Sequence, residues 1–353
     1  MSAEPPAVAA TPDAAALAAW MAAHVAGFRG PLQLSKFAGG QSNPTYLARA
    51  SSGDYVVRCK PAPAAELPPS AHAIEREFRV MQALAGSAVP LAPTFALCAD
   101  ESVIGRVFYV MGHVPGRCFA ENDLPGMGRD ERRAIFDEAN RVIAALHAID
   151  PVAAGLGDHG PAQDYLPRQI ARWTRQYRLA ETQRIEAMES LIAWLPTALP
   201  TASTRLCLLH GDFKLDNLIF DASEPRVVAV LDWELSTLGD PLADFAYHCL
   251  PWHTAPGLLH GLAGLDLDAL GLPAEAEYRQ AYATRRGIEI GSEWNFYLAF
   301  NCFRLAGIFQ GVLRRSLDGT ASHVRAADFG RMAPVMAELG WRLAQSSSEC
   351  CMA

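Results

Sequence analysis

A run of polar and ionisable residues lies between two apolar, strand-like segments in "LLHGDFKLDNLIFD", residues 208–221. Burying an unpaired carboxylate is costly, so this run is either a solvated turn or a site of chemistry. Asp212 and Asn217 stand five positions apart, and Asp232 follows in "VLDWE". A carboxylate can orient a hydroxyl group and accept its proton, whereas an amide oxygen and a second carboxylate are ligands that suit Mg²⁺. Residues of these types in this order indicate phosphoryl transfer to a hydroxyl group.

The same spacing occurs in the catalytic loop of protein kinases, where an aspartate and an asparagine five places later precede a metal-binding aspartate. Lys214 also stands two places after Asp212, as in that loop. Two other interpretations stay open at this point. Asp212 and Asn217 belong to residue types that favour tight turns. "HGD" together with Asp232 could also form a metal-hydrolase site, although no further histidine is spaced to complete one.

The N-terminal third of the chain carries charges of the kind that hold a nucleotide. "YVVRCK" places Arg58 and Lys60 on the same face of one predicted strand. "AIEREFRV", in the helix predicted to follow, supplies Glu75 and Glu77 as acidic partners. Each of these charges alone is typical of a surface, but all of them in one order are much less expected by chance. Upstream, a turn between two strands can close over phosphate groups with its backbone N–H groups, and its candidate residues are Gly39, Gly40, Ser42 and Asn43.

The apolar pattern predicts a small β-rich lobe followed by a larger helical lobe. Strand-like segments occupy 32–38, 45–50, 55–60, 93–100 and 106–114, with a helix over 71–86 capped by Ser70 and an earlier helix that begins after Thr11 or Asp13. Helical patterns cover 129–149, 164–195 and several segments from 275 onward, and strands at 205–210, 217–221 and 226–234 flank the polar run. We therefore predict an α+β fold with an N-terminal lobe over 1–112 and a C-terminal lobe over 113–353.

Composition narrows the classes of function. The 353 residues include 30 Lys and Arg against 38 Asp and Glu, a net charge of −8 that argues against a nucleic-acid-binding protein. The eight cysteines form no Cys-x-x-Cys pair, so neither a zinc site nor a disulfide framework is indicated. The N-terminal segment lacks the basic start of a secretory signal, and no apolar run reaches the ~18 residues of a membrane span. We expect a cytoplasmic protein without nucleic-acid or membrane partners.

The motifs together resemble a known family. "HGDFKLDNLIFD" followed by "VVAVLDWELSTLGDPLADFAYHC" is similar to the aminoglycoside phosphotransferase and choline kinase branch of the protein-kinase-like fold. "YVVRCKP", "SAHAIEREFRVMQAL", "DYLPRQIARWTRQY" and "FNCFRLAGIFQG" resemble, more narrowly, the phosphotransferase domains found beside or fused to acyl-CoA dehydrogenases. The resemblance runs from about Phe37 to Trp341. It implies two lobes, namely a small antiparallel sheet with one main helix and a larger, mainly helical lobe.

The resemblance also implies roles for individual residues, with ATP and Mg²⁺ as cofactors. Asp212 is the implied catalytic carboxylate, and Asn217 and Asp232 are the implied Mg²⁺ ligands. Arg58 stands where relatives carry the phosphate-binding lysine, with Glu77 as its helix partner, although Lys60 remains an alternative. Arginine binds phosphate through two N–H groups, so this exchange need not disable the site. The connector "VMGHVPG" is implied to meet the adenine through backbone groups at Met111 and His113.

The acceptor is less well defined by the sequence. Arg172 belongs to a basic helical face that is either solvated or binds an anionic acceptor, and Arg304 lies inside an apolar helix where its charge requires a partner. An aminoglycoside acceptor would call for an acidic pocket, which the sequence does not indicate. The resemblance instead implies a hydroxylated acyl chain or hydroxyacyl-CoA, with an acyl-CoA dehydrogenase as a potential partner. A catalytically silent nucleotide-binding module and an aminoglycoside- or choline-type kinase are the alternatives.

Overall fold

The computed structural model describes residues 11–37, 43–61, 74–161, 163–201, 206–319 and 326–350. The chain divides into two compact units. Unit 1 comprises Met1–Gly116 and Val228–Glu234, and unit 2 comprises Arg117–Val227 and Leu235–Ala353. The division differs from the predicted lobes in one respect that matters for function, because the short segment that carries Asp232 belongs to unit 1.

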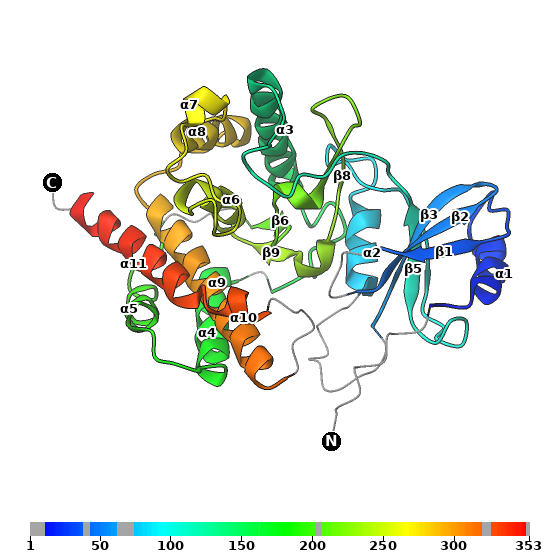
Figure 1. Ribbon diagram of the computed structural model, residues 1–353, viewed down its shortest axis with the longest axis horizontal. Helices are drawn as coiled ribbons and strands as arrows, with labels where there is room; N and C mark the ends of the chain where they lie inside the picture. Colours follow the sequence, from blue (N-terminus) through cyan, green and yellow to red (C-terminus); the bar gives the residue numbers. More distant parts are fainter. Residues whose placement is uncertain are drawn as a thin grey trace. The chain divides into compact units, whose positions relative to one another are not determined.

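Unit 1 is built on one antiparallel sheet of five strands in the order β1-β2-β3-β5-β4 (Figure 1). Its strands are β1 (Gln33–Lys36), β2 (Thr45–Ala50), β3 (Gly53–Cys59), β4 (Thr94–Cys98) and β5 (Phe108–Gly112), and its helices are α1 (Ala14–His24) and α2 (Ile74–Ala83). The predicted small antiparallel sheet is confirmed. Asp13 is the N-cap of α1 and accepts hydrogen bonds from the N–H groups of Ala15 and Ala16. The cap predicted at Ser70 lies outside the described residues.

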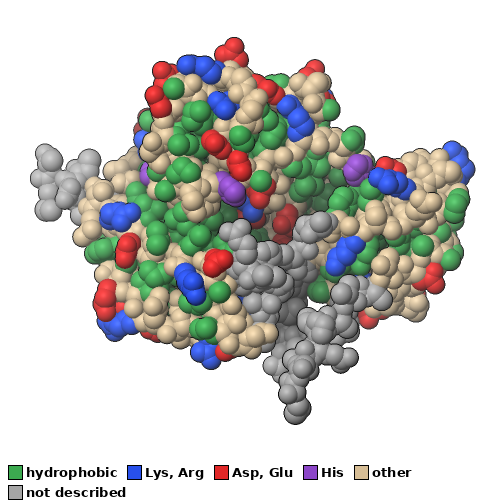
Figure 2. Space-filling model, in the orientation of Figure 1, with side chains coloured by type: hydrophobic (Ala, Val, Ile, Leu, Met, Phe, Trp, Pro, Cys, Tyr) green, Lys and Arg blue, Asp and Glu red, His purple; other side chains and the backbone are tan. Residues whose placement is uncertain are grey.

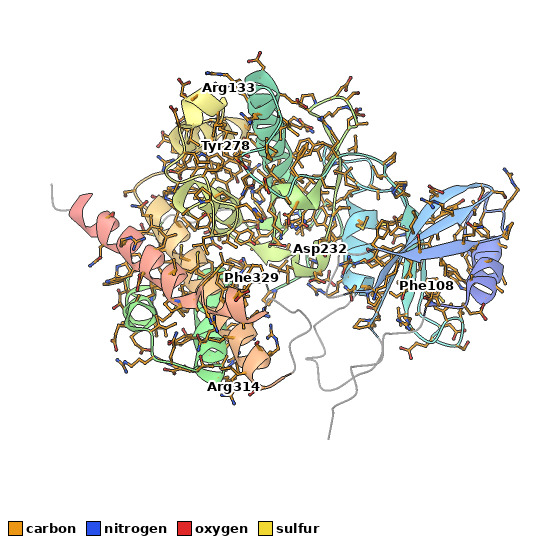
Figure 3. All side chains as sticks on the ribbon, in the orientation of Figure 1. Phe108, Arg133, Asp232, Tyr278, Arg314 and Phe329 are labelled. Atoms are coloured by element: carbon orange, nitrogen blue, oxygen red, sulfur yellow. The ribbon has the colours of Figure 1, made fainter. Side chains whose placement is uncertain are left out.

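The two faces of this sheet follow from the alternation of side chains along its strands. Tyr55, Val57 and Cys59 of β3 face α1, and they form one buried cluster with Leu17 and Met21 of that helix. Phe108, labelled in Figure 3, and Val110 of β5 join the same cluster. The intervening residues face the other way, where the Tyr109 ring packs 5.6 Å from the Phe78 ring of α2. Arg58 alternates with Val57 and Cys59, so it is directed to the side of the sheet on which α2 packs.

Unit 2 is mainly helical and surrounds two short strands that present the polar run. Its helices are α3 (Arg129–Ala148), α4 (Tyr165–Leu179), α5 (Glu186–Trp194), α6 (Pro241–Cys249), α7 (Leu267–Leu270), α8 (Glu275–Arg286), α9 (Trp294–Leu317), α10 (Ala326–Gly330) and α11 (Ala333–Cys350). Strands β6 (Cys207–Leu209) and β9 (Thr237–Gly239) pair antiparallel. The remaining elements are η1 (Leu215–Asn217), β7 (Leu218–Phe220), β8 (Val227–Val230), η2 (Trp233–Leu235) and η3 (Leu250–His253), and β8 leads from unit 2 into unit 1.

Several elements of unit 2 differ from the predicted ones, among them a predicted long helix and a short strand. The helix predicted over 164–195 is two helices, α4 and α5, separated at 180–185. Gln310 of α9 donates to the Thr182 hydroxyl at 2.7 Å within this break, so a tertiary contact holds the connection that the helical pattern did not reveal. Strand β9 was not predicted either. It has only three residues, too few for an alternating pattern to be recognised.

The central helix of unit 2 is α9. Among the described residues it is the one helix that is long and apolar enough to cross a membrane, and 72% of its most apolar window is buried within the protein. No uninterrupted apolar run of that length was found in the sequence because Asn301 and Arg304 interrupt it. The same helix packs against α6, α4 and α11, which is the behaviour of a core helix.

Candidate active site

In unit 1, Arg58 is surrounded by three carboxylates. Its Nε lies 2.8 Å from Glu77 Oε2, and its Nη2 lies 2.6 Å from Asp232 Oδ1 and 3.6 Å from Glu234 Oε2. Asp232, labelled in Figure 3, follows β8 and lies beside α2. The structure therefore brings together three predicted residues, Arg58, Glu77 and Asp232, from a strand, a helix and a segment more than a hundred positions later in the chain.

The groups of this cluster shift one another's pKa values. Glu77 is 1% exposed, and burial raises its pKa to about 7, while Arg58 opposes the rise and the Asp232 and Glu234 carboxylates add to it. Burial works against the charge of Arg58, yet the Glu77 and Asp232 carboxylates hold the pKa of Arg58 above its ordinary value. Three carboxylates and one guanidinium thus share this part of unit 1.

Two neutral side chains complete the cluster. Tyr109 donates its hydroxyl to Glu77 Oε2 at 3.1 Å. Asn43 is 1% exposed and donates Nδ2 to Glu77 Oε1 at 2.9 Å and to Glu234 Oε2 at 3.3 Å. Asn43 thus links the end of the predicted nucleotide loop to the carboxylates. The other predicted loop residues, Gly39, Gly40 and Ser42, lie outside the described residues.

Lys60 and the connector occupy different environments. Lys60 is more exposed than Arg58 and pairs with Glu75 at 2.8 Å, so the structure distinguishes two cations that the sequence left as alternatives. In the connector, the His113 N–H donates to the Asp54 carbonyl at 3.2 Å, and the Gly112 N–H donates to the Pro93 carbonyl at 2.8 Å. Met111 pairs with Val56 in the sheet. Adenine contact at Met111 and His113 remains a prediction.

In unit 2, a buried carboxylate holds the predicted catalytic loop in place. Asp244 of α6 is 2% exposed and accepts hydrogen bonds from the N–H groups of His210, at 2.8 Å, and Gly211, at 2.9 Å. His147 of α3 contacts the same carboxylate at 3.2 Å. Burial alone would raise the pKa of Asp244, but these bonds hold it below its usual value. Asp244 therefore has a structural role, because it holds the backbone at His210 and Gly211 in place.

Asp212 lies at the centre of this loop with both carboxylate oxygens engaged. The Tyr247 hydroxyl donates to Oδ1 at 2.5 Å. Asn217 Nδ2 donates to Oδ2 at 3.1 Å and to the Asp212 carbonyl at 2.8 Å, and Lys214 Nζ lies 3.5 Å from Oδ2. Burial and the Asp212 carboxylate raise the pKa of Tyr247 well above its usual value, so this hydroxyl stays protonated and remains a donor.

Arg304 has the partner that its place in an apolar helix requires. Its Nη2 donates to the Gly211 carbonyl at 2.6 Å, and its guanidinium lies 5.2 Å from the centre of the Tyr247 ring. Gly211 has a φ of 84° and lies so close to Leu235 that an added Cβ would be 2.6 Å from the Leu235 carbonyl oxygen, so a side chain cannot be accommodated there. Arg304 thus supports the backbone on the N-terminal side of Asp212.

Arg172 is not part of this arrangement. It is exposed on α4, and its guanidinium lies 5.4 Å from the centre of the Trp173 ring. On the face drawn in Figure 2, the described acidic and basic side chains are scattered in small groups of both signs. The predicted acceptor role of Arg172 has no support from its described contacts.

The residues proposed to hold Mg²⁺ have the oxygen atoms that the ion requires. Asn217 donates Nδ2 to the carbonyl and to Oδ2 of Asp212, so its Oδ1 takes no part in these two hydrogen bonds. Asp232 is 35% exposed and keeps a second carboxylate oxygen beside the one that Arg58 contacts. Among the described residues no group of three or more His, Cys, Asp or Glu forms a metal cage. Each of the two residues, taken within its own unit, offers an oxygen atom of the kind that Mg²⁺ binds, and their joint role as ligands remains a prediction.

Sequence reasoning missed Tyr247, Asn43's contact with Glu234, and the part played by His147. Tyr247 was within a quoted motif, three residues after Asp244 on α6. The contact between Tyr247 and Asp212 can be predicted only once Asp244 is known to bind the loop. Tyr247 lies one helical turn after Asp244 on α6, so it then faces Asp212. His147 carried no signal, since a lone histidine late in an amphipathic helix is usually part of the core.

The buried side chain of His248 makes the stability of the protein depend on pH. It is 5% exposed, and its Nε2 shares a 2.7 Å hydrogen bond with the Tyr278 hydroxyl. Burial lowers its pKa from 6.5 to about 4, so on acidification the unfolded chain gains a proton before the folded one does. The free energy of unfolding should therefore fall as the pH drops from 6.5 to 4, by up to about 3 kcal/mol. In urea titrations, the free energy of unfolding of His248→Gln should depend less on pH than that of the wild type. An equal pH dependence in the two proteins would show that His248 is not the group responsible.

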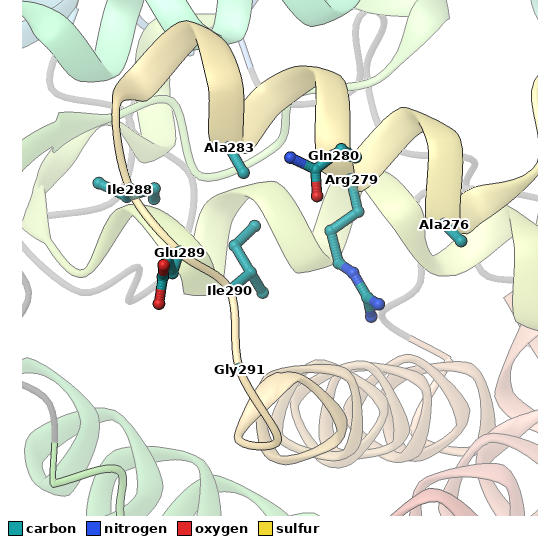
Figure 4. Close-up of a pocket in the computed structure, with 8 residues that line it drawn as sticks. All are labelled: Ala276, Arg279, Gln280, Ala283, Ile288, Glu289, Ile290 and Gly291. Atoms are coloured by element: carbon teal, nitrogen blue, oxygen red, sulfur yellow. The ribbon is translucent and has the colours of Figure 1, made fainter.

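A separate cavity in unit 2 is lined by none of the predicted site residues. It has a volume of about 370 Å³ and lies between α8 and the segment that follows it (Figure 4). Arg279 and Glu289 supply its charged side chains, and Ile288 and Ile290 supply much of its apolar wall. Its size alone does not make it a site of phosphoryl transfer.

Comparisons with known proteins show which family the chain belongs to. Residues 33–292 match the model of the phosphotransferase enzyme family. The chain is 48% identical over 317 residues to mouse acyl-CoA dehydrogenase family member 10, covering 89% of this chain and 29% of that protein. It is 38% identical over 341 residues to human acyl-CoA dehydrogenase family member 11, covering 94% of this chain and 43% of that protein. The chain thus spans less than half the length of these relatives.

Solved structures show the same fold. A protein of Ralstonia eutropha JMP134, described provisionally as an aminoglycoside phosphotransferase, is 54% identical with a TM-score of 0.89, over 95% of this chain and 99% of that one. A thermostable mutant of aminoglycoside phosphotransferase APH(4)-Ia, solved with ADP and hygromycin B, has a TM-score of 0.61 at 16% identity, over 88% of this chain and 94% of that one. This second likeness concerns the fold alone. By its family match and its close relatives, the chain belongs to the phosphotransferase enzyme family.

Proposed function

We propose that this protein is an ATP-dependent small-molecule kinase that transfers the γ-phosphoryl group to a hydroxyl. The observation that carries the proposal is the fixed Asp212 carboxylate, which Asn217 and Tyr247 contact on its two oxygens within a chain of the phosphotransferase family. Arg58, paired with Glu77, is the proposed phosphate-binding cation. The APH(4)-Ia mutant was solved with ADP, which supports an adenine nucleotide as the donor here.

The residues account for the steps of such a reaction. Asp212 would orient the acceptor hydroxyl and take its proton as the new oxygen–phosphorus bond forms and the bond to the departing ADP oxygen breaks. Arg58 would hold phosphate oxygens through its planar guanidinium, released from Asp232 when the nucleotide binds. Asn217 and Asp232 would hold Mg²⁺, whose charge offsets that of the phosphates. Catalysis of this kind rests mainly on positioning and electrostatic stabilisation.

The acceptor class is proposed from the relatives. Two of them are named as acyl-CoA dehydrogenase family members, which suggests an acceptor related to acyl groups. We infer a hydroxylated acyl chain, as a hydroxy acid or its CoA thioester. Phosphorylation would convert a hydroxyl into a better leaving group, which suits further processing by an acyl-CoA dehydrogenase as partner.

An ADP-release assay with Mg·ATP tests this function directly. The panel contains hydroxyacyl-CoAs, free hydroxy acids, choline and aminoglycosides. We expect acceptor-dependent ADP release with the hydroxyacyl class, and phosphorylated product in equal amount by mass spectrometry. Turnover with choline or aminoglycosides alone would reassign the acceptor. Binding of Mg·ATP without transfer to any acceptor would instead favour a catalytically silent module.

A further inference from the structure

A small cavity in unit 2 adjoins the catalytic loop. Its volume is about 130 Å³, and all of its lining residues belong to unit 2. Lys214 and Asp216 of the catalytic loop line one side, and Tyr247 at the end of α6 lines another. The remaining lining residues come from the segment after Arg117, from η3 with its flanks and from the segment before α7, and they are Ala120, Asn122, His248, Leu250, Pro251, Leu259 and His260.

Two wall residues connect this cavity to the reacting carboxylate. Tyr247 donates its hydroxyl to Asp212 Oδ1, and Lys214 Nζ lies 3.5 Å from Asp212 Oδ2. A molecule in the cavity therefore meets two of the side chains that contact Asp212. An acceptor hydroxyl at this wall would take over the hydrogen bond that the Tyr247 hydroxyl now makes to Asp212 Oδ1. The 370 Å³ cavity on α8 lacks any described contact of this kind.

Another part of the wall is held in a defined shape. Asn122 donates Nδ2 to the His260 carbonyl at 2.8 Å and to the Leu259 carbonyl at 3.4 Å, which joins two of the lining segments. Leu259 and His260 have φ values of 54° and 50°, a conformation that non-glycine residues rarely adopt. Such backbone persists where surrounding contacts determine it and is common at ligand-binding sites. The cavity is thus a built feature of this fold.

Size and charge restrict what the cavity can hold. A protein cavity of ~150 Å³ accommodates a benzene molecule, so one of about 130 Å³ takes a group of a few carbon atoms. Leu250, Pro251 and Leu259 give it apolar surface. The carboxylate of Asp216 is already paired with Lys214 at 3.2 Å, and the Asp212 and Asp216 carboxylates hold the pKa of Lys214 up against the effect of burial. A polycationic acceptor would find no unpaired carboxylate among these lining residues.

We propose that this cavity is the acceptor subsite, and that it takes the short, largely apolar part of an uncharged or anionic acceptor next to the hydroxyl that is phosphorylated. The inference rests on the proposed kinase function and specifies the size and charge class of its substrate. Tyr247 and Lys214 form the boundary between this subsite and Asp212. The bulk of a larger acceptor remains outside the cavity.

Filling the cavity from its rim tests the assignment. Ala120 is exposed and lines the cavity, so Ala120→Trp introduces bulk without disturbing the core. Ala153 is exposed in a turn of the same unit and does not line the cavity, which makes Ala153→Trp a matched control. ADP release would be measured with straight-chain hydroxy acids from propanoate to octanoate and with their CoA thioesters. Ala120→Leu serves as a second, smaller filling variant in case the tryptophan variant does not fold.

We expect Ala120→Trp to raise the acceptor KM by about tenfold or more, Ala120→Leu to raise it less, and Ala153→Trp to keep the wild-type value. Wild-type turnover together with an unchanged acceptor KM in both Ala120 variants would overturn the subsite and leave the kinase function standing. Efficient wild-type turnover of an aminoglycoside would overturn the proposed charge class. A wild-type protein that transfers phosphate to none of these acceptors would overturn the kinase function and the subsite together.

Discussion

Replacing Asp212 by asparagine should lower kcat for acceptor phosphorylation by about a hundred- to ten-thousand-fold, the range contributed by a positioned general base. Asparagine keeps the shape of the side chain and can still accept the Tyr247 hydrogen bond, but it cannot take a proton from the acceptor. The Asn217 amide that now donates to Oδ2 would have to adjust. We therefore expect the loss mainly in kcat, with a small change in the KM for ATP, measured by ADP release at saturating acceptor.

Asp221→Asn is the matched control, because it makes the same chemical change in the same polar stretch. Asp221 binds the N–H groups of Ser223 and Glu224 and closes a surface turn, with no described contact to Asp212. Its activity should remain close to wild type. A similar kcat for both variants would show that Asp212 is not the catalytic carboxylate. A large rise in the KM for the acceptor with unchanged kcat would assign Asp212 to binding alone.

Replacing Arg58 by methionine should produce the largest change in stability. The substitution leaves Glu77 buried without its cation, and breaking a buried ion pair from one side typically costs about 3–5 kcal/mol. Asp232 and Glu234 lose the same partner, so the carboxylates would repel one another. We expect the free energy of unfolding to fall by this amount in urea titrations. We also expect ATP binding to weaken strongly, measured by calorimetry under conditions in which the variant is folded.

Two further variants separate the stability effect from the phosphate-binding role. Arg58→Met combined with Glu77→Met removes both buried charges and should recover part of the lost stability without restoring ATP binding. Lys60→Met removes a more exposed pair with Glu75, so its cost should stay within about 1 kcal/mol and ATP binding should persist. Loss of ATP binding in Lys60→Met, with binding retained in the Arg58 variants, would reverse our assignment of the phosphate-binding cation.

Local sequence determined those features of this protein that depend on short spacings. Asp212 and Asn217 are five positions apart, and a single turn of η1 is enough to return the Asn217 amide to Asp212. Alternation along β3 likewise determined that Arg58 points away from the cluster containing Val57 and Cys59. These relations involve a few consecutive residues and are governed by backbone geometry, so they can be inferred from the sequence alone.

Only the tertiary structure decided which distant groups meet. Arg58 and Lys60 share a strand face, yet they pair with different residues of α2. Arg58 pairs with Glu77, whereas Lys60 pairs with Glu75. The chain then returns at 228–234 and adds Asp232 as a partner of Arg58. Tyr247 reaches Asp212 because Asp244, one turn earlier on α6, binds the backbone of the catalytic loop. Such contacts depend on how separate elements pack, and no local pattern encodes that packing. For the same reason, the small cavity beside Asp212 could not be predicted from the residues that line it.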